Sequence, residues 1–286
     1  MLGGEMMIEK IKYILGDTPQ SVKALHGGNI GEVYQVNMPD GACYAVKVAR
    51  ENGTLDIEGR MLIYLAENSR LPVPQVYHHE PSILVMSFIE GTSALTVRAQ
   101  QHAAELLADL HSIRAETFGL PFDTLIGGLH QPNPQTTSWI DFFREHRLLY
   151  MGQEAVKAAK LPGYIMKRLE QLAKRLNEFI TEPEHPSLIH GDMWTTNILA
   201  ADGRITGFID PAVYYAHPEI ELAFSTLFGT FDEVFFQRYA EIRPLAPGFF
   251  PTRRDVYNLY PLLVHVRLFG SGYVQPVDHI LTRLGF

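Results

Sequence analysis

The sequence of 286 residues contains only one cysteine, Cys43, and therefore cannot form an intrachain disulfide bond. It also contains no apolar run of about 18 residues, the length that a membrane-spanning helix needs. The opening residues, MLGGEMMIEK, lack the basic start and apolar centre of a secretory signal. These absences lead us to expect a cytoplasmic protein without a membrane partner.

A run of basic residues is also missing, and the net charge is −8. Proteins that bind nucleic acid usually carry a positively charged surface, so we expect no nucleic-acid partner. Apolar residues make up 46% of the chain and charged residues 20%, which is ordinary for a soluble globular protein. An acidic protein of this kind would bind phosphate groups through a few well-placed basic side chains and metal ions.

The first third of the chain has the pattern of a small α+β unit. Apolar residues recur at helical spacing in two stretches, and β-branched and aromatic residues gather in three others. The predicted order is a helix at 6–16, strands at 32–36 and 43–48, a helix at 55–69 and a strand at 82–91. We expect residues 1–90 to form an N-terminal lobe with an antiparallel sheet.

The rest of the chain is mainly helical, and the join between the two parts is expected near residues 90–96. Three helices are predicted at 99–113, 139–151 and 165–179, with further helices from about residue 219. Short strands are predicted at 188–189 and 205–209. Residues 91–286 should therefore form a larger C-terminal lobe.

Lys47 stands inside the apolar strand YAVKV, where a lysine is costly unless it has a partner. Glu58, eleven residues later in a predicted helix, is the best candidate, with Glu51 and Asp56 as rivals. A strand lysine paired with a helix glutamate is the arrangement by which kinases hold nucleotide phosphates. The alternative is an edge strand whose lysine points to solvent.

The stretch GGNIGEVYQV, residues 27–36, follows a predicted strand at 22–25. Glycines let backbone N–H groups approach phosphate oxygens, so Gly28, Asn29 and Ile30 are candidate nucleotide-binding residues. The kinase spacing is only partly met, because His26 occupies the place of the first glycine. A plain hairpin loop is the alternative.

HGDMWTTN, residues 190–197, has the spacing of a kinase catalytic loop, and FID follows at 208–210. In that interpretation Asp192 takes the proton of the substrate hydroxyl, while Asn197 and Asp210 bind Mg2+. A zinc site is a poor alternative, because the only cysteine is distant and no second histidine has ligand spacing. Taken alone, the stretch could also be a structural polar turn.

The catalytic loop reads HGD, and it therefore lacks the arginine that contacts a phosphorylated activation segment in protein kinases. The segment after Asp210, PAVYYAHPEIELAF at 211–224, has two tyrosines but no serine or threonine and no APE triplet. These features favour a kinase for small molecules over a protein kinase.

With these motifs the chain resembles the aminoglycoside phosphotransferase and choline kinase group, and within it the fructosamine/ketosamine-3-kinase family. The narrower resemblance rests on Trp194 in HGDMWTTN and on the stretches at 118–148, 210–223 and 259–273. The chain departs from the family pattern at Thr124, at FIDPA and at residues 216–219.

The resemblance implies a two-lobed protein-kinase-like fold and ATP-dependent, Mg2+-dependent phosphorylation of a ketosamine at its 3-hydroxyl. The acceptor would be a fructosamine or ribulosamine, free or on a glycated protein, and its phosphorylation a step of repair. Lys47 and Glu58 would hold the nucleotide, and the backbone near Met86 and Phe88 would bind adenine. The chain would act as a monomer or a homodimer.

Further roles follow from the same resemblance and from side-chain chemistry. Trp194 could stack on the sugar or anchor the loop, whereas Trp139 is interpreted as a core residue. Tyr214, His217 and, with equal weight, His265 are candidate substrate contacts. Glu221 is expected to support the catalytic loop.

Two other functions stay open. An acidic pocket built from Asp123, Asp141 and Glu219 would suit a cationic aminoglycoside or choline as the acceptor. A pseudokinase would bind nucleotide without chemistry, although every catalytic position carries a competent residue.

Overall fold

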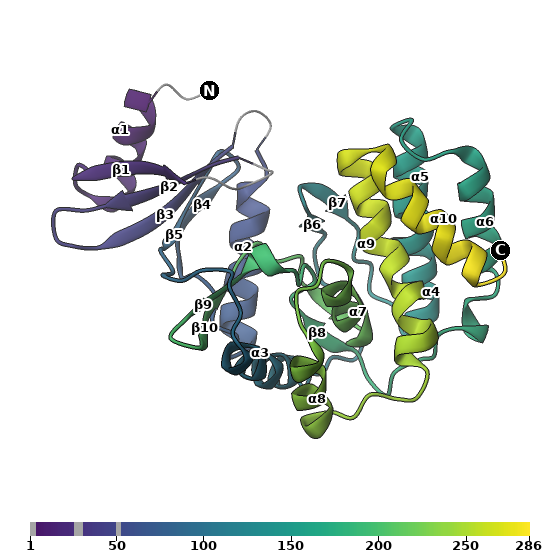
Figure 1. Ribbon diagram of the computed structural model, residues 1–286. Helices are drawn as coiled ribbons and strands as arrows, with labels where there is room; N and C mark the ends of the chain where they lie inside the picture. The colour runs from purple at the N-terminus through teal and green to yellow at the C-terminus, as the bar shows by residue number, and fades with distance from the viewer. Residues whose placement is uncertain (1–3, 26–30, 50–52) are drawn as a thin grey trace.

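The computed structural model describes residues 4–25, 31–49 and 53–286. A small unit built around one sheet and a larger helical unit lie side by side in Figure 1, joined by an extended segment after the sheet. The segment is held by Thr92, whose N–H donates to the Ala200 carbonyl at 3.0 Å. No helix among the described residues is long and apolar enough to cross a membrane.

The sheet has five antiparallel strands in the order β1-β2-β3-β5-β4. Side chains of a strand alternate between the two faces, so Val46 and Val48 share one face while Ala45 and Lys47 share the other. Helix α1 covers the first face with Met7 and Ile11. The sheet and its two helices comprise α1 (Gly4–Leu15), β1 (Ser21–Leu25), β2 (Glu32–Asn37), β3 (Cys43–Val48), α2 (Leu55–Asn68), β4 (Val76–Glu80) and β5 (Ile83–Ser87).

Helix α2 packs against the second face, where its Leu55 and Leu62 meet Ala45 and Met86. This packing places the second face of β3, and with it Lys47, toward α2. The alternation of the strand therefore explains why a lysine can stand between valines whose side chains lie in the core.

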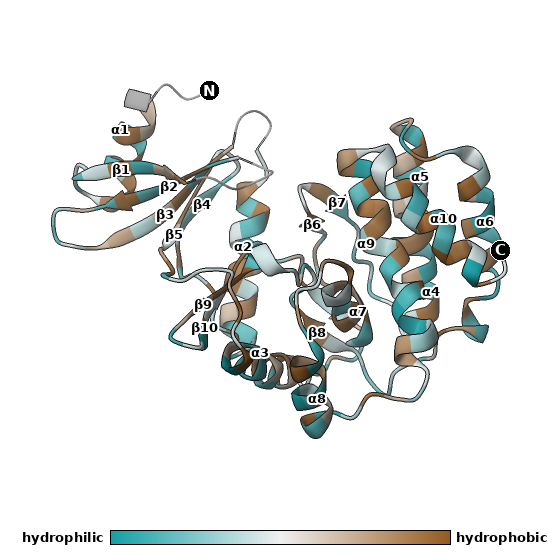
Figure 2. Ribbon diagram, in the orientation of Figure 1, coloured by the Kyte–Doolittle hydropathy of each residue, from teal (hydrophilic) through white to brown (hydrophobic). Residues whose placement is uncertain are grey.

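The larger unit is a set of helices around one apolar core, with three two-stranded ladders inserted. Figure 2 shows teal and brown alternating along the outer helices α6 and α10, as expected for helices with one buried face. The helices are α3 (Val97–Leu110), α4 (Trp139–Phe143), α5 (Tyr150–Lys157), α6 (Gly163–Ala173), α7 (Glu219–Leu227), α8 (Glu233–Ile242), α9 (Arg254–Phe269) and α10 (Val274–Arg283).

The three ladders flank the loops at 127–128, 190–197 and 209–213. They are β6 (Thr124–Ile126) with β7 (Leu129–Gln131), β8 (Ser187–Ile189) with β11 (Tyr214–Ala216), and β9 (Ile198–Ala201) with β10 (Arg204–Phe208). Short π- or 3-10 turns occur at Arg144–Leu149, Leu176–Glu178, Thr195–Asn197, Phe249–Arg253 and Ser271–Tyr273.

The predicted fold class, a two-lobed α+β architecture, is confirmed, and most predicted helices lie within a few residues of their expected ends. The helix predicted at 139–151 is instead two α-helices joined by a π-helical segment. The helix predicted at 165–179 ends at Ala173, because the chain then turns to bury Leu176 and Ile180. The β6–β7 ladder, β4, β9 and β11 were not predicted, since strands of three to five residues carry little periodicity.

Candidate active site

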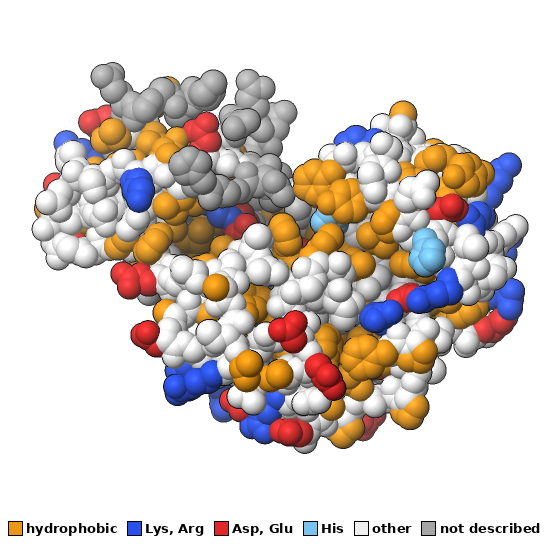
Figure 3. All heavy atoms as spheres, viewed as in Figure 1, with side chains coloured by type: hydrophobic (Ala, Val, Ile, Leu, Met, Phe, Trp, Pro, Cys, Tyr) orange, Lys and Arg blue, Asp and Glu red, His pale blue; other side chains and the backbone are white. Residues whose placement is uncertain are grey.

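A cleft of about 710 Å³ lies between the sheet and the helical unit. Its size is within the range of ligand pockets in proteins. Figure 3 shows the hollow between the two units, with acidic and basic side chains inside it. Both units line the cleft, through Val33, Ala45, Lys47, Glu58, Met86, Phe88, Gly127, Gly128, Asp192, Trp194, Asn197 and Asp210 among others.

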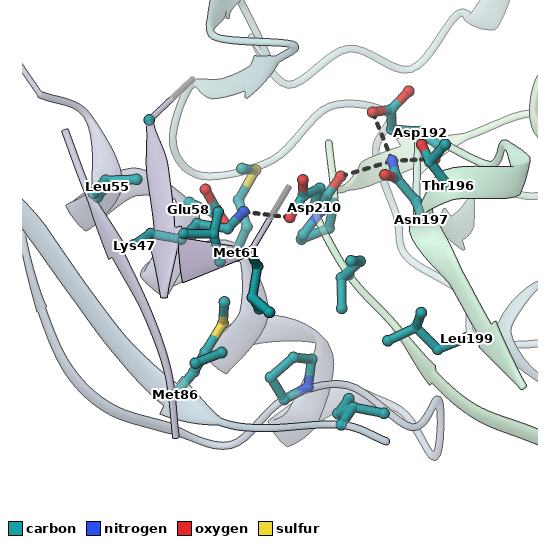
Figure 4. Close-up of a pocket in the computed structure, with 18 of the residues that line it drawn as sticks. Lys47, Leu55, Glu58, Met61, Met86, Asp192, Thr196, Asn197, Leu199 and Asp210 are labelled. Atoms are coloured by element: carbon teal, nitrogen blue, oxygen red, sulfur yellow. Dashed lines mark hydrogen bonds and ion pairs between the residues drawn. The ribbon is translucent and has the colours of Figure 1, made fainter. Parts of the chain in front are cut away.

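Lys47 on β3 is the centre of a buried ion-pair network. Its Nζ donates to Glu58 Oε1 on α2 at 2.6 Å and also to the carboxylate of Asp210 (Figure 4). Burial alone would lower the pKa of Lys47, but the charges of Asp210 and Glu58 outweigh burial and raise it. The predicted partner Glu58 is confirmed; Asp56 does not contact Lys47, and Glu51 lies outside the described residues. The lysine is therefore a fixed positive charge that faces the cleft.

Asp192 and Asn197 face each other across the catalytic loop. The Asn197 Nδ2 donates to Asp192 Oδ2 at 2.9 Å and to the Asp192 carbonyl at 3.0 Å (Figure 4). The side-chain oxygen of Asn197, Oδ1, is thereby left without a hydrogen bond among the described residues, whereas its backbone carbonyl accepts the N–H of Ile209 at 3.0 Å. Burial, and then the negative charge of Asp210, raise the pKa of Asp192 to about 8. A carboxylate with such a pKa can take a proton near neutral pH.

Glu221 on α7 holds the backbone of the catalytic loop through hydrogen bonds. Its carboxylate accepts the N–H of Gly191 at 2.6 Å and of His190 at 3.3 Å, and it also contacts His111 Nε2 at 2.8 Å. His190 Nε2 lies 3.1 Å from the Ile209 carbonyl, which ties the loop to the residue before Asp210. The prediction that Glu221 supports this loop is confirmed.

Gly191 explains why the loop reads HGD. Its φ is +88°, and an added Cβ would lie 2.1 Å from the carbonyl oxygen of Ala212. Only glycine fits both the left-handed backbone and this close approach. The absence of an arginine at this position is therefore a packing requirement as well as a functional difference.

The proposed adenine-binding strand, β5, forms the back of the cleft. Met86 and Phe88 line the cleft, as predicted. The N–H groups of Ser87 and Phe88, however, already donate to Gln75 and Cys43 carbonyls. The N–H of Ile89 makes no hydrogen bond among the described residues, and Ile89 also lines the cleft. Of these three neighbouring N–H groups, that of Ile89 is therefore the one left free to bind a ligand.

Gly28, Asn29 and Ile30 lie outside the described residues. The next glycine, Gly31, lines the cleft, and a Cβ there would meet the Val48 carbonyl at 2.6 Å. This close contact requires glycine at the start of β2.

Of the candidate substrate contacts, only Trp194 lines the cleft. Tyr214 is buried under the guanidinium of Arg147, which lies 3.9 Å from its ring centre. His217 is buried too, and its Nδ1 accepts the N–H of Glu219 at 3.1 Å. The structure therefore does not bring Tyr214 and His217 to the cleft. Trp139 is fully buried, as predicted.

The hypothesis that Asp123, Asp141 and Glu219 form an acidic substrate pocket is wrong. Asp123 pairs with His130 at 2.9 Å, and Asp141 pairs with Arg144 on an exposed helix face. Glu219 is buried against the guanidinium of Arg253. These carboxylates have separate partners, and none of them lines the cleft.

Gln131 is a residue that the sequence did not single out. It is fully buried; its Nε2 donates to Thr124 Oγ1 at 2.8 Å and to the Ala212 carbonyl at 3.1 Å. Its Oε1 accepts the hydroxyl of Tyr260 at 2.7 Å. Ala212 in turn donates its N–H to the His190 carbonyl at 2.8 Å. Gln131 therefore links the β6–β7 ladder, which lines the cleft, to the catalytic loop.

Comparison with known proteins gives a consistent result. The fructosamine kinase family model matches residues 5–285. A probable ketoamine kinase of Synechocystis sp. is 34% identical over 278 residues, which cover 92% of this chain and 90% of that relative. The chloroplastic protein-ribulosamine 3-kinase of Oryza sativa subsp. japonica is 33% identical over 88% of this chain and 75% of its own.

Solved structures show the same similarity in three dimensions. One from Thermobifida fusca, provisionally named a fructosamine-3-kinase, has a TM-score of 0.86 at 29% identity and covers 98% of this chain and 100% of its own. An aminoglycoside phosphotransferase, solved with ADP and hygromycin B, has a TM-score of 0.72 at 18% identity, with each chain covered completely. The second match shows a shared kinase-like fold.

Proposed function

Since this chain belongs to the fructosamine kinase family, we propose that it transfers the γ-phosphoryl group of ATP to the 3-hydroxyl of a ketosamine. The acceptor is a fructosamine or ribulosamine, either free or carried by a glycated protein. The observation that carries the proposal is the meeting of Lys47, Asp192, Asn197 and Asp210 in one cleft, although they come from three separate segments. Phosphorylation at this hydroxyl is a repair step that commits the sugar adduct to breakdown.

Asp192 is the base of the reaction. Its carboxylate accepts the proton of the acceptor hydroxyl while the oxygen forms a bond to the γ-phosphorus. The bond between that phosphorus and the oxygen bridging to the β-phosphate breaks, and ADP leaves with the bonding pair. Asn197 keeps Asp192 oriented through its two hydrogen bonds to that residue.

Lys47 and the cleft backbone hold the nucleotide. Glu58 fixes the lysine ammonium, which pairs with phosphate oxygens, and the Ile89 N–H faces the place of the adenine. Trp194 offers its ring to the apolar face of the sugar.

The oxygen atoms of Asn197 and Asp210 fit a magnesium site. Among the described residues no three His, Cys, Asp or Glu side chains gather closely enough to hold a metal ion by themselves. Mg2+ commonly takes one or two protein oxygens and completes its shell with water and phosphate. The side-chain oxygen of Asn197, Oδ1, and the carboxylate of Asp210 would provide such a pair. When bound, the ion would neutralise charge on the phosphates.

The test is ATP consumption with Mg2+ over a panel of fructoselysine, ribuloselysine, choline and an aminoglycoside, with the phosphorylated position assigned by NMR. Turnover of the ketosamines with phosphate on O3 is the expected result. Turnover of only choline or the aminoglycoside would refute the ketosamine assignment and retain the kinase mechanism.

Asp192→Asn tests the role of the base. We expect kcat to fall by about 10²–10⁴-fold, while the dissociation constant of Mg·ADP changes less than about twofold. Asp202→Asn is the matched control, since Asp202 is exposed in the β9–β10 turn and its φ of +51° is one that asparagine tolerates. An unchanged kcat in Asp192→Asn would refute the proposed base.

A further inference from the structure

Next to Trp194, which lines the cleft, further aromatic rings of the helical unit pack against one another. The ring of Trp194 packs edge-on against Phe228 at 6.0 Å, and Phe228 lies 4.9 Å from the ring of His265. His265 in turn lies 4.9 Å from Tyr273 and 5.6 Å from Phe269. We name Phe228, His265, Phe269 and Tyr273 the aromatic rim.

The aromatic rim is partly open to solvent. Phe228 is 37% exposed and Phe269 is 53% exposed, unusual values for phenylalanines that already contact other rings. Figure 3 shows hydrophobic side chains on the edge of the helical unit that faces the hollow between the units. A molecule that reaches Asp192 and extends past Trp194 would meet these rings.

His265 gives the aromatic rim a specific polar group. Its Nδ1 lies 2.7 Å from the Pro261 carbonyl, which can only accept, so Nδ1 carries a hydrogen atom. The Nε2 of the neutral ring is then a hydrogen-bond acceptor, and among the described residues it has no partner. Burial lowers the pKa of His265, which favours this neutral form. The residue is only 9% exposed, so the acceptor lies within the ring cluster.

These features are complementary to a cation that carries hydrogen on nitrogen. Aromatic faces attract an ammonium group, and a neutral imidazole nitrogen accepts its N–H. Phe228 and Phe269 carry no ionisable group, so these two rings add no cation that would repel such a group. The same rings would pack against an alkyl chain that leads away from the nitrogen.

We propose that the aromatic rim binds the amine arm of the acceptor, a secondary alkylammonium whose N–H is donated to His265 Nε2 and whose chain packs on Phe228 and Phe269. This inference rests on the proposed function. In a ketosamine the amine nitrogen and O3 are separated by only three carbon atoms. An acceptor whose O3 is held at Asp192 therefore has its nitrogen beside Trp194 and its chain directed outward.

The experiment compares two ketosamines that differ only in the arm, fructosyl-hexylamine and fructosyl-methylamine, with the full chain and Mg·ATP. Phe228→Ala and Phe269→Ala should each raise KM for the hexyl compound roughly three- to tenfold and leave KM for the methyl compound almost unchanged. His265→Phe keeps a ring but removes the acceptor, so it should raise KM for both compounds roughly tenfold. The kcat values should stay within about twofold, because these contacts are the same in ground and transition states.

Phe250→Ala is the matched control, because Phe250 is 43% exposed and does not belong to the aromatic rim. The proposal is overturned if the variants of Phe228 and Phe269 behave like Phe250→Ala with the hexyl compound. It is also overturned if they change the oligomeric state in light scattering and leave KM unchanged, since the rim would then be a contact between copies of the chain.

A binding measurement that needs no phosphoryl transfer tests this inference independently of the proposed function. The chain has two tryptophans, so 5-fluorotryptophan labelling gives two 19F signals, one from Trp194 and a reference from buried Trp139. N-methylhexylammonium should shift the Trp194 signal in the wild type and in Phe250→Ala, but less in Phe228→Ala. If no ketosamine is phosphorylated and this shift is still seen, the proposed function fails and the ammonium site stands. An absent shift in the wild type overturns the site.

Discussion

Gln131→Met removes the link between the β6–β7 ladder and the catalytic loop while nearly preserving side-chain volume. Three hydrogen bonds are lost, those to Thr124, the Ala212 carbonyl and Tyr260. Thr124 Oγ1 keeps a donor in Asn133 Nδ2 at 2.8 Å, so two buried groups lose their partner. At about 1–3 kcal/mol for each unsatisfied group, the free energy of unfolding should fall by roughly 2–6 kcal/mol.

The effect on activity should be selective. The Ala212 carbonyl touches Gly191 and the Ala212 N–H holds the His190 carbonyl, so the substitution loosens the backbone beside Asp192. A displacement of about 1 Å costs on the order of 10²-fold in rate. We therefore expect kcat/KM for the acceptor to fall roughly 10- to 100-fold. The dissociation constant of ADP measured without Mg2+ should stay within about twofold, because Lys47 and Glu58 belong to the other unit.

Gln100→Met is the matched control for this experiment. Gln100 is also buried and bonds Asp232 with both ends of its amide, at 3.0 and 2.8 Å, but it does not line the cleft. Tyr260→Phe removes only one of the three hydrogen bonds. It can therefore still be measured if Gln131→Met does not fold. Equal losses of kcat/KM in Gln131→Met and Gln100→Met, at matched thermal stability, would refute the link.

Two further predictions concern pH and the catalytic loop. Burial and the positive charge of Arg253 lower the pKa of His217 from 6.5 to about 3, so between these values only the unfolded chain takes up this proton as pH falls. Urea titrations at several pH values give the free energy of unfolding of the wild type and of His217→Gln. As the pH falls, this free energy should decrease more steeply in the wild type, by up to about 1.4 kcal/mol for each pH unit. Equal slopes in the two proteins would contradict the prediction. Gly191→Ala should lower kcat at least about tenfold, because the added methyl group would clash with the Ala212 carbonyl. Gly203→Ala is the control, since Gly203 also has a positive φ, +74°, but a Cβ there would meet no atom within 3 Å. This control should only lower the melting temperature. A normal kcat in Gly191→Ala would show that the loop adapts.

Much of the candidate site follows from the sequence because its chemistry is carried by residues with fixed spacing. A lysine in an apolar strand needs a carboxylate, and Glu58 in the following helix was preferred over the rivals Glu51 and Asp56. The spacing of Asp192 and Asn197 is short enough that one loop brings them together. Relations between residues at such short spacings can be inferred without knowing the fold.

Residues without a local pattern were assigned poorly. Tyr214 and His217 follow Asp210 closely in sequence, but Tyr214 in β11 and His217 just after it are both buried. Asp123, Asp141 and Glu219 are acidic in sequence, yet each contacts a different basic side chain away from the cleft. The direction of a side chain in a three-residue strand is decided by packing against distant helices.

The sequence by itself determined the order of the kinase motifs, the two-part α+β architecture and the pairing of Lys47 with Glu58. Only the tertiary structure decided that Gln131 reaches the Ala212 carbonyl, 81 residues away along the chain, and that the aromatic rim packs beside Trp194. The physical reason is that these contacts join segments with no common periodicity. Their partners are selected by burial of polar groups and by ring packing, which arise when the helical unit closes around its core.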